Sequence, residues 1–179
     1  MKRVVRIRKI ANLVVLLMTL CWSPAAPAQT NSVATAPTGA ALTISGDVEK
    51  PLSLSLDDLR HLPRKTLSLK NPHDDKQESY EGVPLAELLK RAGVPRGGRM
   101  RAAASAYIVA EATDGFRAVL SVAETDPDFE DSEILVADTL NGAAMGENDG
   151  PLRLVLPHDH KASRWVRMLH SLTVVSVSK

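Results

Sequence analysis

The sequence has almost no cysteine. Its one cysteine, Cys21, lies in an N-terminal segment that we predict to be cleaved on export. The mature chain would then have no thiol, which excludes disulfide bonds, thiolate zinc sites and CxxC redox motifs. The roughly 150 mature residues are enough for one domain that buries ~70% of its unfolded surface. Such a domain can be stable in an oxidising compartment without disulfides.

The sequence also lacks an apolar run long enough to cross a bilayer. The run at 10–22 is shorter than the ~20 residues that a spanning helix needs, and it contains Asn12. It follows a basic segment with no acidic residue and precedes the small-residue site Ala26-x-Ala28. This order is that of a secretory signal peptide cleaved after Ala28.

A lipoprotein signal ending at Cys21 is the weaker alternative, because Leu20 is bulky where such signals carry a small residue. We therefore predict a signal peptide at 1–28, a flexible linker at 29–41 that is rich in Ala, Thr, Ser, Gly and Pro, and one domain at 42–179. The mature protein is expected in the periplasm or outside the cell, with no membrane attachment after cleavage.

No excess of positive charge remains in the mature chain. The sequence has 22 Lys and Arg against 21 Asp and Glu, and five of the basic residues lie in the signal peptide. The mature net charge is therefore −4, and no run of Lys or Arg remains. This excludes nucleic acid as a partner, because its binding depends on neutralising phosphates. Two catalytic motifs are missing as well: no Gly-x-Ser-x-Gly is present, and Arg96-Gly97-Gly98-Arg99 lacks the spacing of a phosphate loop.

Strands and short helices alternate without a strict βαβ order, so the predicted class is α+β with a mixed sheet. Short helices are expected after Ser55 and Ser121, which are each followed three residues later by an acid that completes a capping box. A third helix, with leucines spaced three and four residues apart, is expected after Pro84. The predicted strands are 42–46, 66–69, 106–113, 116–120, 134–137, 152–156 and 172–177. Residues 71–79 are polar and are expected to form a loop.

Several motifs occur in an order that resembles a known family. They are Gly-Val-Pro-Leu at 82–85 before the leucine helix, Asp-Gly-Phe at 114–116 after a strand, Asn-Gly at 141–142, Gly-Pro-Leu-Arg-Leu-Val-Leu-Pro at 150–157 and Arg-Trp-Val at 164–166. This pattern resembles the molybdopterin-binding domain of the sulfite-oxidase-like oxidoreductases. It covers almost all of the mature chain, so the resemblance implies that fold for residues 42–177.

The resemblance also implies a ligand that this chain lacks. In the family, a pterin dithiolene and a cysteine thiolate hold molybdenum, and the cysteine ends the strand before the Gly-Val-Pro-Leu segment. The equivalent position here is Leu69, within two residues, and leucine has no lone pair to donate. Molybdopterin therefore stays an implied cofactor, while the missing thiolate lowers the expectation of redox activity.

The densest polar group of the chain is the candidate site. It comprises Arg153, His158, His160, Lys161, Ser163 and Arg164. One hypothesis is a pocket for a small anion or a pterin phosphate, in which Lys and Arg donate charge-assisted hydrogen bonds. By resemblance, Lys161, Ser163 and Arg164 match positions that face the pterin phosphate. The alternative is a solvated loop after a strand, with Arg153 pointing outward.

His158 and His160 also allow a metal hypothesis. Two histidines separated by one residue in an extended segment face the same way, and imidazole binds zinc and copper. A third ligand would have to come from residues 71–75, and two histidines alone rarely make a closed site. The favoured hypothesis is therefore an exported, non-catalytic binding or accessory module, with a periplasmic protein among its expected partners. A molybdopterin oxidoreductase with non-cysteine ligation and a periplasmic metal-binding protein are the alternatives.

Overall fold

The computed structural model describes residues 40–94, 104–129, 131 and 133–177, all of which belong to one compact unit. The predicted signal peptide with Cys21, the linker up to residue 39 and the Arg96–Arg99 segment lie outside the described residues. No helix within the described part of the chain is long and apolar enough to cross a membrane.

Two sheets form the domain, one mixed and one antiparallel, as expected for an α+β fold. The first has the strand order β2-β1-β10-β5-β6. Its strands are β1 (Leu42–Gly46), β2 (Leu52–Leu54), β5 (Ala106–Ala112), β6 (Arg117–Ser121) and β10 (Leu169–Ser176). β1 and β10 run parallel although they come from opposite ends of the domain, and the other pairs are antiparallel.

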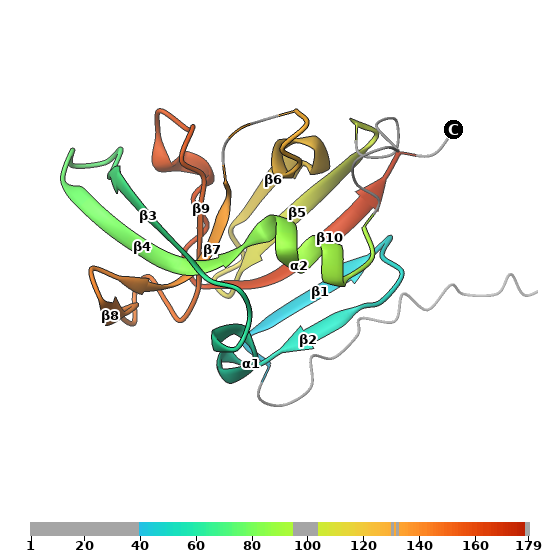
Figure 1. Ribbon diagram of the computed structural model, residues 1–179, viewed down its shortest axis with the longest axis horizontal. Coiled ribbons are helices and arrows are strands. Elements are labelled where there is room, and N and C mark those ends of the chain that lie inside the picture. Colours follow the sequence, from blue (N-terminus) through green and yellow to red (C-terminus); the bar gives the residue numbers. More distant parts are fainter. Residues whose placement is uncertain (1–39, 95–103, 130, 132, 178–179) are drawn as a thin grey trace, which may run out of the picture. The chain divides into compact units, whose positions relative to one another are not determined.

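The second sheet carries the strands that surround the candidate site. Its order is β3-β4-β7-β8, and β9 pairs with β7 as well. Its strands are β3 (Lys65–Lys70), β4 (Gln77–Pro84), β7 (Leu135–Leu140), β8 (Ala143–Ala144) and β9 (Arg153–Val155). The hairpin β3–β4 extends away from the first sheet in Figure 1, whereas β9 lies close to β7.

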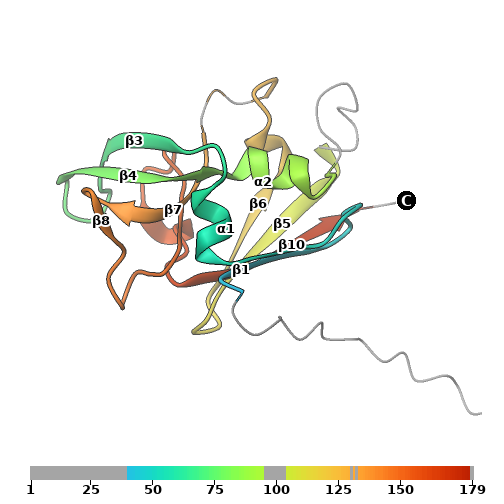
Figure 2. The same cartoon turned by 60° about the horizontal axis from the view of Figure 1, so that its bottom comes forward.

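Short helices form where capping residues were found in the sequence. Helix α1 (Leu56–Arg60) and the 3-10 helix η1 (Val122–Thr125) both have the predicted capping boxes, at Ser55 and Ser121. Helix α2 (Leu85–Arg91) buries its three leucines, and the second 3-10 helix, η2 (Ala162–Arg164), is a single turn between β9 and β10. In both cartoon views α2 lies over the first sheet (Figures 1 and 2).

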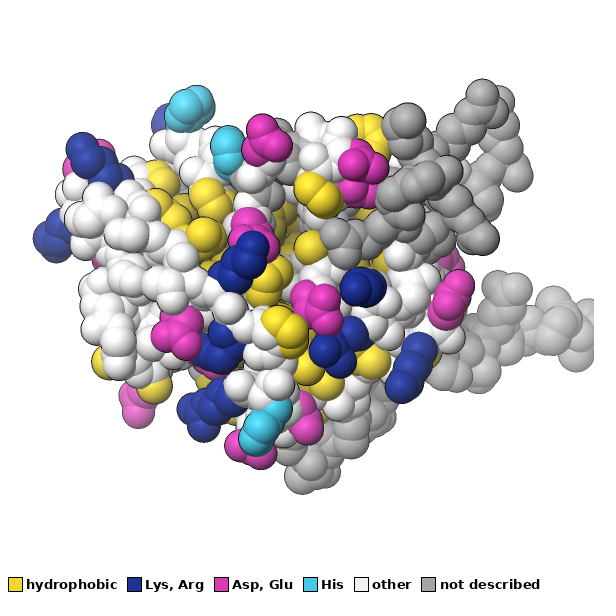
Figure 3. Space-filling model, in the orientation of Figure 1, with side chains coloured by type: hydrophobic (Ala, Val, Ile, Leu, Met, Phe, Trp, Pro, Cys, Tyr) yellow, Lys and Arg dark blue, Asp and Glu magenta, His cyan; other side chains and the backbone are white. Residues whose placement is uncertain are grey.

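One apolar core joins the two sheets and α2. Ile44 and Val174 come from the first sheet, Leu135 and Leu154 from the second, and Leu88 from α2; all five are at most 1% exposed. On the visible face, acidic and basic side chains are interspersed (Figure 3).

Steric crowding explains why the Gly-Val-Pro-Leu segment begins with glycine. β4 shifts its register against β7 between Glu81 and Gly82. A Cβ at Gly82 would lie 2.1 Å from the carbonyl oxygen of Val136, which no side chain can tolerate. Only glycine therefore lets the two backbones approach here.

Several strands differ from the sequence-based expectation: β2, β8 and residues 80–84 of β4 were not predicted, and β7 ends at Leu140, three residues after its predicted end. Residues 77–79 belong to β4, although the whole of 71–79 was expected to be a loop. Their polar side chains fit a strand because the hairpin β3–β4 is solvated at this end: Lys70 pairs with Gln77, and both are exposed. The last strand starts at Leu169, three residues before the predicted start.

A partly buried ion cluster connects β4, β7 and the segment before β3. The guanidinium of Arg64 donates two hydrogen bonds to the carboxylate of Asp138, at 3.0 and 2.7 Å, and one to Glu81 at 2.8 Å. The Asp138 side chain is only 6% exposed. Burial raises the pKa of Asp138, but the hydrogen bonds from Arg64 and Thr139 outweigh it, so the pKa lies below its ordinary value.

We predict that Asp138→Asn lowers the free energy of unfolding at pH 7 by about 3 kcal/mol, since it leaves a partly buried guanidinium without its main partner. The stabilisation by the carboxylate is complete above the unfolded-state pKa and is lost as the pH falls through the lower folded-state pKa. The difference between wild type and variant should therefore shrink below about pH 4. Urea unfolding at pH 7 and pH 3 measures both effects.

The matched control is Glu111→Gln, which breaks the exposed ion pair with Arg117. It should leave stability unchanged at both pH values, because exposed pairs contribute little. An Asp138→Asn variant as stable as this control would show that the cluster does not stabilise the fold.

Candidate functional site

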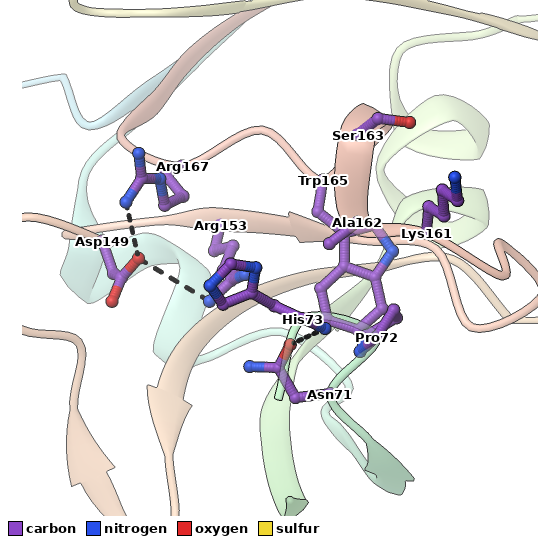
Figure 4. Close-up of a pocket in the computed structure, with 10 residues that line it drawn as sticks. All are labelled: Asn71, Pro72, His73, Asp149, Arg153, Lys161, Ala162, Ser163, Trp165 and Arg167. Carbon is purple, nitrogen blue, oxygen red and sulfur yellow. Dashed lines mark hydrogen bonds and ion pairs between the residues drawn. The ribbon is translucent and has the colours of Figure 1, made fainter. Parts of the chain in front are cut away.

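A cleft of about 670 Å³ opens where three segments of the second sheet meet. These are the turn after β3, the residues that lead into β9, and the segment around η2 (Figure 4). The lining residues are Asn71, Pro72, His73, Asp149, Arg153, Lys161, Ala162, Ser163, Trp165 and Arg167. The volume lies within the range of small-molecule sites.

Arg153 is the central residue of this cleft. It was expected to point outward if the polar group were only a solvated loop, but its side chain is 10% exposed. All three residues of β9 are buried, because β9 pairs with β7 and also takes part in the apolar core. The outward orientation is therefore wrong, since β9 has no solvated face.

Two aromatic rings hold the Arg153 guanidinium. Its Cζ lies 5.6 Å from the ring centroid of Tyr80 and 5.3 Å from that of Trp165. The two rings contact each other edge to face, with centroids 5.6 Å apart. Contacts of this kind stabilise a desolvated cation by ~2 kcal/mol.

Hydrogen bonds fix both rings in turn. The Tyr80 hydroxyl donates to Glu78, which also accepts from the Asn71 side chain at 3.0 Å. The Trp165 indole N–H donates to the Leu156 carbonyl at 2.9 Å. Burial, together with the hydrogen bond to Glu78, raises the pKa of Tyr80, so its hydroxyl stays protonated as the donor.

The charge of Arg153 is only partly compensated. Its Nε is buried and has no hydrogen-bond partner among the described residues. Its Nη1 lies 3.6 Å from Oδ1 of Asp149, and Nη1 of Arg167 lies 3.9 Å from the same oxygen. Both distances are longer than a hydrogen bond. Asp149 therefore lies between two arginines and forms ion pairs, without hydrogen bonds, to both (Figure 4).

Three of the six predicted site residues line the cleft: Arg153, Lys161 and Ser163. Figure 4 shows Lys161 and Ser163 on the other side of Trp165 from Asp149. His158 and His160 are exposed and do not line the cleft. Within the described residues, no group of three or more His, Cys, Asp and Glu side chains is placed to hold a metal ion.

Arg164 lies outside the lining of the cleft, so its predicted contact with a pterin phosphate stays a prediction. It donates two hydrogen bonds to Asp159, at 3.0 and 2.6 Å, and one to Glu124 at 3.1 Å. The hydrogen bonds to Asp159 are the main cause of its raised pKa. Arg164 therefore joins η2 to the preceding loop and to η1.

Asp149 and Arg167 are the site residues that the sequence did not reveal. Asp149 precedes Arg153 by four residues, but the segment between them is not a helix, so the spacing predicts no contact. The sequence carries no signal for either contact, because both depend on how β9 and η2 fold back on each other. A backbone hydrogen bond joins the segment before β9 to the segment after η2: the Met168 N–H donates to the Asp149 carbonyl at 3.1 Å.

A smaller hollow of about 240 Å³ adjoins the cleft. The two share Ala162, Ser163, Trp165 and Arg167, and the smaller one is completed by Asp114 and Phe116 from the β5–β6 turn. Phe116 is 45% exposed. The cleft thus continues into a hollow of mixed polarity, where Asp114 and the Phe116 ring are added to the shared residues.

Comparisons with known proteins agree with this architecture. The family model described as "Oxidoreductase molybdopterin binding domain" matches residues 75–179, more than half of the chain. Among solved structures, the sulfane dehydrogenase SoxCD from Paracoccus pantotrophus is similar, with a TM-score of 0.59 and 24% identity. The match covers 77% of this chain but 39% of that one, so this chain spans about two fifths of its length. No curated protein matches the sequence.

Proposed function

Because the chain belongs to the sulfite-oxidase-like oxidoreductase molybdopterin-binding domain family, we propose that it is an exported binding or accessory module of that family. In this proposal the cleft binds a small anionic ligand, and the protein supplies no ligand to molybdenum. The observation that carries the proposal is the buried, incompletely paired guanidinium of Arg153 in the wall of the cleft.

The residues of the cleft fit one end of molybdopterin but not the metal end. Arg153, Lys161 and Arg167 offer positive charge to a phosphate. None of the described residues that line the cleft has a thiol, and Leu69, which matches the family's cysteine to within two residues, packs against the apolar core. The cleft therefore lacks the soft ligand through which such a protein holds molybdenum, and we derive no redox step from it.

Burial of Arg153 supports a binding role over a structural one. Removing a guanidinium from water costs several kcal/mol, and a protein that needed only stability would do as well with an apolar residue. Two rings and a distant carboxylate compensate this cost only in part. An oxyanion in the cleft would complete the compensation with charge-assisted hydrogen bonds.

One alternative keeps the cofactor. The turn after β3, which would follow the ligand position, lines the same cleft as the cationic residues. A pterin could then bind through its phosphate, with an oxygen in place of the thiolate. This alternative makes the chain an oxidoreductase and is separated from the first proposal by chemical analysis.

We predict that Arg153→Met weakens anion binding without loss of stability. Replacing a buried charge by an apolar side chain of similar size is commonly neutral or stabilising by ~1 kcal/mol or more. Calorimetric titration with sulfate should show at least about tenfold weaker binding, the effect of losing one charge-assisted contact. Urea unfolding should show an equal or higher free energy of unfolding.

Arg117→Met is the matched control, because it removes the same charge from an exposed position on β6 outside the cleft. It should bind sulfate like wild type. Equal affinity of wild type and Arg153→Met would contradict the proposed site.

Molybdenum and pterin analysis tests the absence of a cofactor. The protein, expressed with its native signal in a host that makes molybdenum cofactor, should purify without stoichiometric molybdenum. Acid oxidation of the same sample should release no fluorescent pterin. Bound, redox-active molybdenum would contradict the first proposal, and released pterin without molybdenum would favour the alternative.

Export is a separate part of the proposal and rests on residues 1–28 of the sequence. N-terminal sequencing of protein recovered from the periplasm or the medium should begin at Gln29, as expected for cleavage after Ala28. A mature chain that starts at a lipidated Cys21 would show that the lipoprotein alternative is correct.

A further inference from the structure

Among the described residues that line the cleft, Asp149 is the one acid, and its carboxylate faces the two arginines there. The same oxygen, Oδ1, forms an ion pair with both guanidinium groups, at 3.6 Å from Nη1 of Arg153 and 3.9 Å from Nη1 of Arg167. An oxyanion placed between the two arginines would occupy this same position. The carboxylate of Asp149 is itself an oxyanion, so the protein already places the chemistry of the proposed ligand at this position.

Asp149 does not orient Arg153. The 3.6 Å separation is too long for a hydrogen bond, and the guanidinium lies against the rings of Tyr80 and Trp165. Those rings are held by Glu78 and by the Leu156 carbonyl, without any contribution from the Asp149 side chain. The arginine would therefore keep its place if the carboxylate were removed.

The backbone of Asp149 is anchored independently of its side chain. Its N–H donates to the Gly146 carbonyl at 3.0 Å, and its carbonyl accepts from the Met168 N–H at 3.1 Å. The side chain is 34% exposed and so has room to turn toward solvent. A ligand can displace the carboxylate without moving the loop.

We infer that Asp149 is a built-in competitor for the anion site: its carboxylate holds the place between Arg153 and Arg167 that an oxyanion of the ligand takes on binding. This inference rests on the proposed function and makes Asp149 a residue that sets affinity. Because the carboxylate is tethered at the site, only a ligand that engages both guanidinium groups displaces it. A tetrahedral oxyanion such as sulfate or phosphate has enough oxygens to do so.

The test is Asp149→Asn, which keeps the size of the side chain and removes its charge. Sulfate should bind at least about tenfold more tightly than to wild type, because a unit charge ~4 Å away contributes one to several kcal/mol. Calorimetric titration at fixed pH and ionic strength measures the change. Asp57→Asn, the same substitution at an exposed carboxylate outside the cleft, should leave the affinity unchanged.

Each outcome separates this inference from the proposed function. Binding by wild type with equal or weaker binding by Asp149→Asn overturns the competitor role and leaves the anion site in place. Lack of sulfate binding by both proteins overturns the anion site itself, and the competitor role with it.

A second variant keeps the test decisive if Asp149→Asn does not fold. Arg167 is 56% exposed, so Arg167→Gln is expected to fold. It leaves Asp149 opposite a single guanidinium, and sulfate should bind at least about tenfold more weakly, because one of the two cationic partners is lost. Unchanged affinity would show that Arg167 and Asp149 do not share the ligand's position.

Discussion

The cleft depends on one buried cation. Arg153 is the first residue of β9, and its side chain is buried. Its guanidinium lies against Tyr80 of β4 and Trp165 of the η2 segment. These three residues are far apart in the sequence, so the cation can be accommodated only when β4, β9 and the η2 segment have come together. The rings thus shield the guanidinium from water, while the Arg153 side chain still lines the cleft.

The cleft lies beside the end of β3, the strand at which the resemblance places the family's cysteine. The turn after this strand supplies Asn71, Pro72 and His73. At the expected ligand position, Leu69 packs inward and adds apolar contact. The family fold is retained, and no thiol stands at Leu69 or within two residues of it.

Local chemistry made most of the fold predictable from the sequence. The capping boxes at Ser55 and Ser121 and the turn at Asn141-Gly142, where both residues have positive φ, are determined by residues close in the chain. The site was only partly predictable. The polarity of Arg153 suggested an outward side chain, but the pairing of β9 with β7 buried it. Asp149 and Arg167 meet through a non-local backbone contact, which no sequence pattern encodes.

Stability and binding make opposite demands on this cleft. A full ion pair at hydrogen-bond distance would compensate Arg153 best and would close the site to a ligand. An arginine with no carboxylate nearby would bind an anion most tightly but would leave a buried charge uncompensated in the empty protein. Asp149, shared between two arginines at 3.6 and 3.9 Å, lies between these limits. It reduces the cost of the buried charge when the cleft is empty, yet its contacts are weak enough for an oxyanion to replace them. The unpaired Nε of Arg153 is the part of that cost which the protein leaves uncompensated.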